Sequence, residues 1–302
     1  MKTGFSTNAF TEKSLLYCID SISDIGYDGV ELVLDIPHAF LPLNKKYLST
    51  IKNCLKKNKI EVANLNVNTV VGWYDKNTVI EKFEPSLSNK NEKLRQWRLN
   101  YTKQAIELAS TLDSHNICIT SGISPKSEKS IHLHNFKKSL TELASFAETK
   151  NISIAIEYEP GLLIENSHDV YRIVSQFNNV GLNLDVCHTA VLGEDISKII
   201  KKFRKKILHT HISDCKNNVH YHLIPGLGNI DFSAMYKSLK EINYEGFLTA
   251  ELYTYSKNPE YAAKITFKSA LPLARLCARH LLVRRQEYPR KQFYFGQHAA
   301  QL

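Results

Sequence analysis

Short apolar runs alternate along the chain with longer segments in which apolar residues recur every three or four positions. The spacing of Ala105, Leu108, Ala109 and Leu112 places one apolar stripe along a helix. Ile152–Ile156 is almost continuously apolar, which is typical of a strand in a parallel sheet that is covered on both faces. The pattern therefore predicts repeated strand–helix units.

Eight such units are predicted. The expected strands are Thr3–Thr7, Gly29–Leu34, Glu61–Asn66, Asn116–Thr120, Ile152–Tyr158, Val180–Asp185, Ile207–Ile212 and Phe247–Leu252. The expected helices are Lys13–Ile25, Lys45–Lys57, Leu94–Leu112, His134–Lys150, Ser167–Phe177, Asp195–Arg204, Phe232–Ile242 and Pro259–Val283. Eight β/α units predict an α/β fold of the (β/α)8 TIM-barrel type. An open doubly wound sheet is the alternative, and the lack of a GxGxxG or GxxxxGK[ST] motif after any strand disfavours it.

Composition places this barrel among soluble proteins. The 302 residues are 43% hydrophobic and 23% charged, and no run of about 18 apolar residues is present to span a membrane. The first residues lack the apolar stretch of a signal peptide, and the six cysteines are scattered without a CxxC pair. We expect a cytoplasmic protein with free thiols. Residues 1–283 are assigned to a single barrel domain and residues 284–302 to a basic, aromatic C-terminal tail.

The net charge of +9 is concentrated in two places. Lys201–Lys206 holds five basic residues and no acid, and the segment 275–291 holds six basic residues and one acid. In a barrel both would lie at the N-terminal ends of the strands, whereas active sites lie at the C-terminal ends. We expect a solvated surface there, with a subunit contact or an anionic partner as the alternative; nucleic acid over the active site is not expected.

Carboxylates and histidines stand at the ends of four successive strands. Glu157 lies at the end of the fifth expected strand, Asp185 at the end of the sixth, His211 in the seventh and Glu251 at the end of the eighth. These ends converge on one cavity in a barrel. A mixed oxygen and nitrogen set suits Mn²⁺, Mg²⁺, Co²⁺ or Zn²⁺ and not soft copper. Such an ion could bind two neighbouring oxygens of a sugar.

Four motifs resemble those of the xylose-isomerase-like TIM barrels. Asp185–His188 is similar to the family's D-x-x-H, His209–Asp214 to its H-x-H-x-x-D and Pro225–Phe232 to its PGxGxIDF, and the fourth motif is Ala250-Glu251 at the end of the last expected strand. The resemblance covers roughly residues 3–270. This family includes sugar and sugar-phosphate isomerases and epimerases, dehydroshikimate dehydratases and the endonuclease IV group.

The resemblance implies that Glu157, Asp185, His211 and Glu251 ligate one divalent metal ion. It further implies that Glu157 and Glu251 exchange a proton with substrate carbon, one on each face of the sugar. A proton next to a carbonyl leaves readily only if the developing negative charge is stabilised, which a chelated cation does. His188 would donate a hydrogen bond to a substrate oxygen; its alternatives are a second metal ligand or a packed core histidine.

Further substrate-binding candidates are less specific, and three of them have a structural alternative. They are Glu159, Lys216, His222, Arg98 and Glu31. Glu159 stands two positions after Glu157, so both side chains would point inward. Glu159 would contact substrate, or would accept hydrogen bonds from the residues that do. Arg98 would anchor an anionic substrate or be a helix-surface charge, and Glu31 would touch substrate or be a buried acid with a backbone donor. His209 points inward but deeper, and is expected to be a core histidine.

The family's branches leave several functions open. The nuclease branch adds histidines after strands three and four and a D-x-H motif after strand seven. Here the first two are absent and the third is His220-Tyr221-His222, so a trinuclear phosphodiesterase site is disfavoured. We expect a metal-dependent isomerase or epimerase acting on a small sugar or sugar phosphate. A single-metal lyase of the dehydroshikimate dehydratase type and a non-catalytic metal-binding assembly component remain alternatives, and a homo-oligomer is possible.

Overall fold

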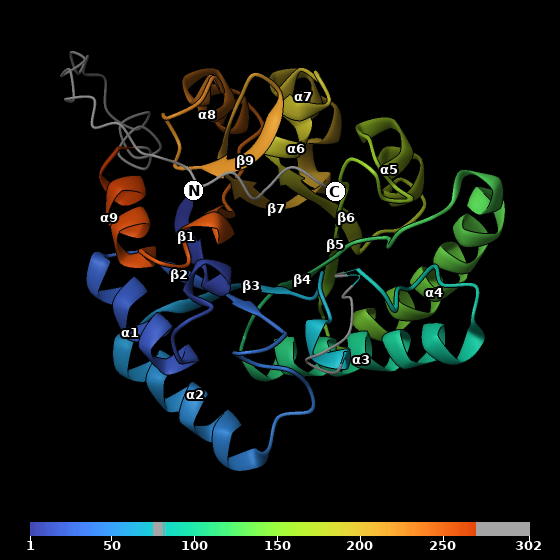
Figure 1. Cartoon of the computed structure of the whole chain (residues 1–302), viewed down its shortest axis with the longest axis horizontal. Coiled ribbons are helices and arrows are strands. Elements are labelled where there is room, and N and C mark those ends of the chain that lie inside the picture. Colours follow the sequence, from blue (N-terminus) through green and yellow to red (C-terminus); the bar gives the residue numbers. More distant parts are fainter. Residues whose placement is uncertain (75–80, 82, 270–302) are drawn as a thin grey trace.

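The computed structural model describes residues 1–74, 81 and 83–269, and within them eight parallel strands close into a barrel (Figure 1). The strands are β1 (Lys2–Ser6), β2 (Gly29–Val33), β3 (Glu61–Asn66), β4 (Asn116–Ile119), β5 (Ser153–Glu157), β6 (Val180–Asp185), β7 (Ile207–Ile212) and β10 (Phe247–Ala250). Their order around the barrel is β1-β10-β7-β6-β5-β4-β3-β2, and pairing of β1 with both β2 and β10 closes it. The predicted TIM barrel is confirmed.

Helices surround the barrel (Figure 1). They are α1 (Leu15–Ile25), α2 (Lys45–Asn58), α3 (Glu92–Thr111), α4 (Lys129–Glu148), α5 (Ser167–Val174), α6 (Val186–Val191), α7 (Ile196–Phe203), α8 (Phe232–Glu241) and α9 (Pro259–Ser269). Short 3-10 helices are η1 (Thr7–Phe10), η2 (Val71–Trp73), η3 (Lys126–Glu128), η4 (Arg204–Lys206) and η5 (Tyr253–Tyr255). None of the helices that the structure describes has both the length and the hydropathy to span a bilayer.

Most of the helices begin where a polar side chain accepts a hydrogen bond from the backbone of the first turn. The residues that do this are Ser14, Asn44, Asn91, Asn166, Asp185, Asp195 and Asp231. Each such cap satisfies a backbone donor that has no partner inside the helix. Asp185 is also the last residue of β6, so its cap places the start of α6 directly at the strand end.

The core combines the strands with one stripe of each helix. Ile154 and Ile156 of β5 are fully buried, and so are Leu140 and Leu143 on the inner face of α4. This arrangement buries both faces of the sheet, as the continuous apolar runs predict. The burial therefore follows the two periodicities seen in the sequence.

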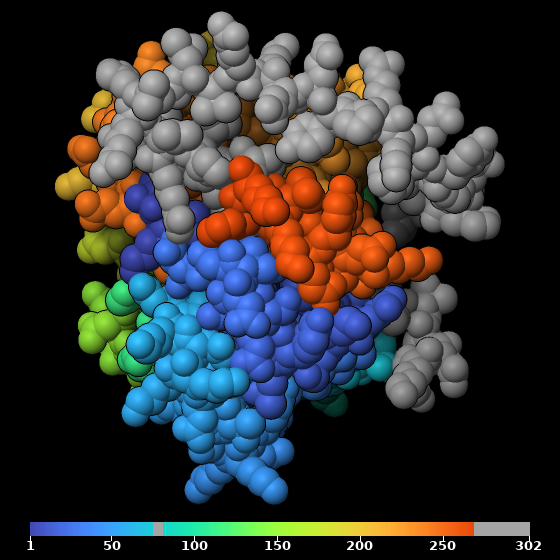
Figure 2. All heavy atoms as spheres, turned by 90° about the vertical axis from the view of Figure 1, so that its left-hand side faces the viewer, coloured from blue at the N-terminus to red at the C-terminus, as the bar shows by residue number. Residues whose placement is uncertain are grey.

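Helix α9, at the end of the described chain, packs against elements near its beginning. Figure 2 shows α9, in orange-red, lying against α1, in blue. The Tyr27 hydroxyl, which follows α1, donates to the carbonyl oxygen of Ala263 at 2.9 Å, and its ring meets that of Phe267 at 5.0 Å. The later part of the expected helix Pro259–Val283 and the tail 284–302 lie outside the described residues.

Three features of the fold differ from the sequence-based expectations. An antiparallel hairpin, β8 (Asp214–Lys216) and β9 (Val219–Leu223), follows β7, and α6 begins directly after β6. Neither was predicted. Helix α4 begins at Lys129 and not at His134. The hairpin turns at Asn217 and Asn218, with φ of 55° and 58°, the left-handed conformation that a two-residue type I′ turn requires.

The basic segment Lys201–Lys206 spans the end of α7 and η4, immediately before β7 begins. It therefore lies at the N-terminal end of the barrel, opposite to the strand ends that carry the candidate site. Lys206 Nζ donates to backbone carbonyls that include that of Val180 at 3.2 Å, and Lys201 pairs with Glu241 at 3.0 Å. Lys201 and Lys206 thus have structural contacts at the N-terminal end of the barrel.

Candidate metal centre

Four side chains meet at the C-terminal ends of neighbouring strands. Glu157 is the last residue of β5, Asp185 is the last of β6, His211 lies in β7, and Glu251 follows β10. One ligand atom from each lies within 4.8 Å of the others, and all four residues are buried. The structure therefore brings together the four residues predicted as ligands, in an arrangement that could hold one ion.

Asp185 tests whether the cluster suits a cation. It caps α6: its Oδ1 accepts from the backbone N–H of Cys187 at 2.7 Å and of His188 at 2.9 Å. Its Oδ2 is buried and has no hydrogen-bond partner among the described residues. A buried carboxylate oxygen without a partner is unfavourable, and coordination of a cation would satisfy it. The three-carboxylate, one-imidazole donor set fits Mn²⁺, Mg²⁺, Co²⁺ or Zn²⁺.

The charges of the four-residue cluster also favour a bound cation. Burial and the neighbouring carboxylates of Glu157 and Asp185 raise the pKa of Glu251 well above its usual range, although His211 opposes them. Burial by itself would lower the pKa of His211, but Glu251, Glu31 and Glu157 raise it well above the usual value. The cluster thus attracts positive charge, and a bound dication would take the place of the imidazolium proton.

Glu31 fixes the orientation of the His211 ring. Its Oε2 lies 2.7 Å from His211 Nε2 and accepts from Asn64 Nδ2 at 2.7 Å. Since a carboxylate accepts, Nε2 carries the proton and Nδ1 faces Glu157 and Glu251, at 3.4 and 3.5 Å. Metal-bound histidines are commonly held in this way.

Glu31 is therefore better explained as a positioning residue than as the predicted substrate contact, because its side chain is wholly buried behind His211. The sequence alone could not separate these roles, since the strand position is the same for both. His209 lies deeper, with Nε2 3.4 Å from Glu31 Oε2, and it is buried. This is the core position expected for it.

Buried amides support the carboxylates, and the sequence reasoning missed them. Asn68 donates to Glu157 Oε2 at 2.7 Å, Asn183 donates to the same oxygen at 3.0 Å, and Asn66 donates to Glu251 Oε1 at 3.3 Å. A signal was present in the sequence: Asn64, Asn66 and Asn68 occupy alternate positions in and just after β3. Side chains at alternate positions of a strand point to one face, here the barrel interior.

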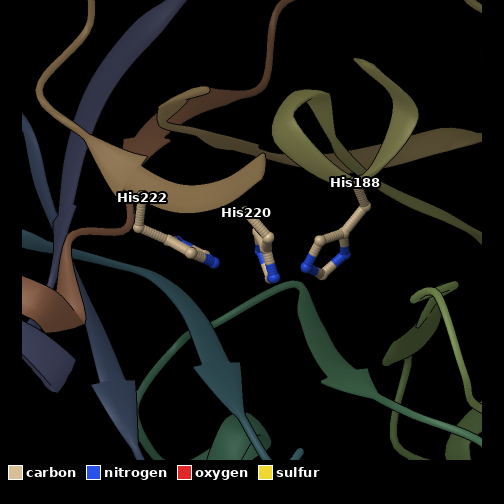
Figure 3. A group of neighbouring side chains, drawn as sticks. All are labelled: His188, His220 and His222. Carbon is tan, nitrogen blue, oxygen red and sulfur yellow. The ribbon is translucent and has the colours of Figure 1, made fainter. Parts of the chain in front are cut away.

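Three histidines form a second group beside the centre (Figure 3). His188 lies in the first turn of α6, and His220 and His222 lie on β9. The ring centroids of His188 and His220 are 4.5 Å apart, and those of His220 and His222 are 4.2 Å apart. Of these, His188 and His222 were predicted to contact substrate, and both border the centre: His188 Nδ1 lies 3.5 Å from Glu157 Oε1.

The remaining candidates lie at different distances from this centre. Glu159 is partly buried and its backbone N–H donates to Ile164, whereas Lys216 is exposed on β8. Arg98 is buried, with 2% of its surface exposed, so the alternative of a helix-surface charge is wrong. Its guanidinium donates to the backbone carbonyls of Val67 and Asn68, and these hydrogen bonds hold the loop after β3 in place. Contact of Arg98, Glu159 or Lys216 with substrate remains a prediction.

The acid of the H-x-H-x-x-D motif has a structural role. Asp214 accepts from the backbone N–H groups of Gly226, Gly228 and Ile230 at 2.9, 2.8 and 3.1 Å. A Cβ atom at Gly228 would lie 2.1 Å from the carbonyl oxygen of Cys215, so only glycine fits there. The glycine-rich segment is thus a loop anchored by Asp214.

The family model for the xylose isomerase-like TIM barrel matches residues 19–269. The chain belongs to this family. It is 25% identical to the fructoselysine 3-epimerase of Shigella flexneri over 287 residues, which cover 90% of this chain and 99% of that protein. It is 33% identical to the inosose isomerase of Bacillus subtilis over 162 residues, which cover 49% of this chain and 56% of that protein. These relatives support an enzyme of the isomerase and epimerase class.

A solved structure of the IOLI protein with a bound zinc atom shares the fold. Its TM-score is 0.73 at 24% identity, and the match covers 91% of this chain and 98% of that one. At this identity the likeness shows the fold, and the zinc belongs to that protein. For this chain, the case for a metal ion rests on its own four-residue cluster.

Proposed function

We propose that the protein is a divalent-metal-dependent isomerase or epimerase of a sugar or sugar phosphate, which moves a proton on a carbon next to a carbonyl group. The observation that carries the proposal is the presence of two carboxylates, Glu157 and Glu251, in one buried cluster with Asp185 and His211. The epimerase and isomerase relatives support the same class of reaction.

The roles follow from where the groups stand. When bound, the ion would hold and polarise neighbouring oxygens of the sugar. Glu157 and Glu251 would exchange protons with the substrate carbon, one on each face of the sugar. Asn66 and Asn68 hold one oxygen of each carboxylate, which leaves the second oxygen of each for proton transfer or ligation. His188 would hydrogen-bond to a substrate oxygen.

Exchange of substrate hydrogen with solvent tests the proposal whichever stereocentre reacts. The Mn²⁺-loaded protein is incubated in D₂O with ketohexoses, their phosphates, fructoselysine and inososes, and products are followed by NMR. We expect deuterium at the carbon beside the carbonyl of the true substrate, together with the isomer or epimer. Glu251→Gln should lower this exchange by about 100-fold to 10,000-fold, the usual contribution of a general base.

Two controls make the result specific. Glu245→Gln changes an exposed acid just before β10 and should leave the rate unchanged. Mn²⁺ binding by Glu251→Gln must also be measured, because the exchange rate is informative only in the loaded variant. Full exchange in the loaded Glu251→Gln protein would remove Glu251 from the mechanism. Loss of water from the substrate would replace the isomerase by the lyase alternative.

A further inference from the structure

Four aromatic side chains form a stack beside the mouth of the barrel. The ring centroids of Trp73 and Trp97 are 4.2 Å apart, and that of Trp97 is 5.1 Å from Tyr101 and 6.5 Å from Phe40. Phe40 lies in the loop after β2 and Trp73 ends η2 after β3, whereas Trp97 and Tyr101 lie on α3. This aromatic stack therefore joins two loops at the C-terminal ends of the strands to α3.

The inner end of the aromatic stack is fixed and its outer end faces solvent. Tyr101 is buried, and its hydroxyl donates to the carbonyl oxygen of Leu34 at 2.6 Å and accepts from the backbone N–H of Leu41 at 3.3 Å. Trp73, at the outer end, has 39% of its surface exposed. Because Trp97 packs against this indole, the stack presents a flat apolar surface to solvent from a defined position.

The buried carboxylate of Asp35 holds the backbone next to Trp73. It accepts from the Thr69 hydroxyl at 2.7 Å and from the backbone N–H of Gly72 at 2.8 Å. A Cβ atom at Gly72 would lie 2.6 Å from the ring of Phe40, so a side chain there would push the ring away. An indole that is held before a ligand arrives loses little conformational freedom when the ligand covers it.

The loop that carries Trp73 begins at the candidate metal centre. Asn68 donates to Glu157 Oε2 at 2.7 Å, and Trp73 follows Asn68 by five residues. Five residues span at most about 18 Å even when fully extended. Two linked sugar rings, together with the reach of the two side chains, can cover this distance.

Exposed apolar side chains stand on both sides of Trp73. Ile36, in the loop after β2, is 49% exposed, and Ile123, in the loop after β4, is 38% exposed. β2, β3 and β4 are neighbours in the barrel, whereas the proposed metal ligands come from β5, β6, β7 and the end of β10. Ile36, Trp73 and Ile123 thus form an apolar arc across the mouth from the candidate centre, and such a patch beside a site marks a binding surface.

We propose that the apolar arc is a second subsite of the candidate centre, at which the indole of Trp73 stacks on a second sugar ring of the substrate. The faces of a sugar ring carry C–H groups and its hydroxyls lie at the edge, so a flat indole can cover a face while the hydroxyls stay in water. The substrate class is then a glycosylated ketose and not a free monosaccharide. This inference rests on the proposed function, because the centre has to hold the first ring.

Affinities for sugars with and without the second ring test the proposal. The full-length, Mn²⁺-loaded protein is titrated by calorimetry with fructose and with isomaltulose and lactulose, two disaccharides in which fructose carries a second ring. We expect at least one disaccharide to bind about 10-fold more tightly than fructose, the gain from burying roughly 55 Å² of apolar surface. Trp73→Ala should remove this advantage and leave the affinity for fructose unchanged.

Intrinsic fluorescence locates the second ring. The chain has two tryptophans, Trp73 and Trp97, and both belong to the aromatic stack. In Trp97→Phe, Trp73 is therefore the sole tryptophan. The disaccharide that binds should shift its emission to shorter wavelength, because water leaves the indole, whereas fructose should not.

Matched variants make the result specific. Trp73→Tyr keeps an aromatic face and should retain most of the advantage, and Tyr261→Ala, at an exposed aromatic residue of α9, should retain all of it. Trp73→Leu, which keeps apolar packing against Trp97, replaces Trp73→Ala if a thermal melt shows that the alanine variant is unfolded. Equal affinities of the wild type for fructose and both disaccharides, or an undiminished advantage in the folded variant, would overturn the proposal. A change of oligomeric state in that variant, with no effect on sugar binding, would assign the arc to a second copy of the chain instead.

Deuterium exchange, measured as above, separates this subsite from the proposed function. Exchange into fructose with no gain from a second ring would keep the isomerase and remove the subsite. Disaccharide binding that depends on Trp73, without exchange in any sugar, would keep the subsite and remove the isomerase.

Discussion

At the scale of single residues, the acids of the candidate centre are held by neutral donors. Asn68 and Asn183 donate to Glu157, Asn66 donates to Glu251, and backbone N–H groups hold Asp185. A neutral donor orients a carboxylate without cancelling its charge, so the attraction for a dication is kept. The ligands are thus oriented before the ion arrives.

The Glu31→Gln variant tests this orientation, because Glu31 contacts Nε2 of the proposed ligand His211. The glutamine keeps an acceptor for His211 Nε2 but lacks the negative charge that strengthens Nδ1 as a ligand. We expect the affinity for Mn²⁺ to fall by about 10-fold to 100-fold, as measured by calorimetric titration of the metal-free protein. Glu61→Gln, at the exposed start of β3, is the control and should bind Mn²⁺ normally. Equal affinities of Glu31→Gln and the wild type would show that His211 needs no charged partner.

How much of the site the sequence predicts depends on whether the role of a residue follows from its position in a strand or from the packing of its side chain. The four proposed ligands stand at strand ends, and the barrel brings strand ends together, so their meeting could be predicted. The role of Glu31 could not be predicted, because only the packed interior shows that it lies behind His211 at 2.7 Å. Arg98 was likewise ambiguous, since burial of a helix residue depends on the loop that covers it.

At the scale of elements, the eight barrel strands were predicted because each is a continuous buried run. The hairpin β8–β9 was missed because its strands are short and half exposed, without a clear alternation. Its turn had a signal in Asn217-Asn218, since asparagine tolerates the positive φ that such a turn needs. The missed hairpin carries His220 and His222, two of the three histidines beside the candidate centre, so the sequence-based prediction of the site was incomplete there.

The loop after β2 gives a prediction for the dependence of stability on pH. His38 is buried there, with Nε2 3.1 Å from the carbonyl oxygen of Phe10, and burial lowers its pKa below the usual 6.5. The unfolded chain therefore binds this proton more readily than the folded protein does. The contribution to stability is present above about pH 6.5 and is lost as the pH falls through the lowered pKa.

Urea unfolding of the metal-free wild type and His38→Gln at pH 7.5 and pH 5 measures this contribution. The difference in unfolding free energy between the two proteins should shift against the wild type at pH 5, by at most about 1.4 kcal/mol for each pH unit. His134→Gln, at an exposed histidine, should show no such shift relative to the wild type. A difference that stays constant with pH would mean that His38 accepts its proton equally in both states.

At the scale of the whole molecule, charge is divided between the two ends of the barrel. The basic segment Lys201–Lys206 lies at the N-terminal ends of the strands, and the acids of the candidate centre lie at the C-terminal ends. A dication is thus attracted to the C-terminal mouth, and the basic side chains stand at the opposite end of the barrel. The four proposed ligands come from β5, β6, β7 and the end of β10, which are consecutive around the barrel.

An ion at this centre joins half of the barrel, so its removal should lower the stability of the entire fold. No arrangement of the unfolded chain brings the four ligands together, so binding adds directly to the free energy of unfolding. With free Mn²⁺ at 100 times its dissociation constant, the gain is about 2.7 kcal/mol, and the melting temperature of a chain of this length should rise by about 4 °C. Thermal melts with Mn²⁺ and with a chelator measure the rise. Asp185→Asn removes the ligand whose Oδ2 has no partner among the described residues, and it should abolish the rise; an equal rise in that variant would place the ion elsewhere.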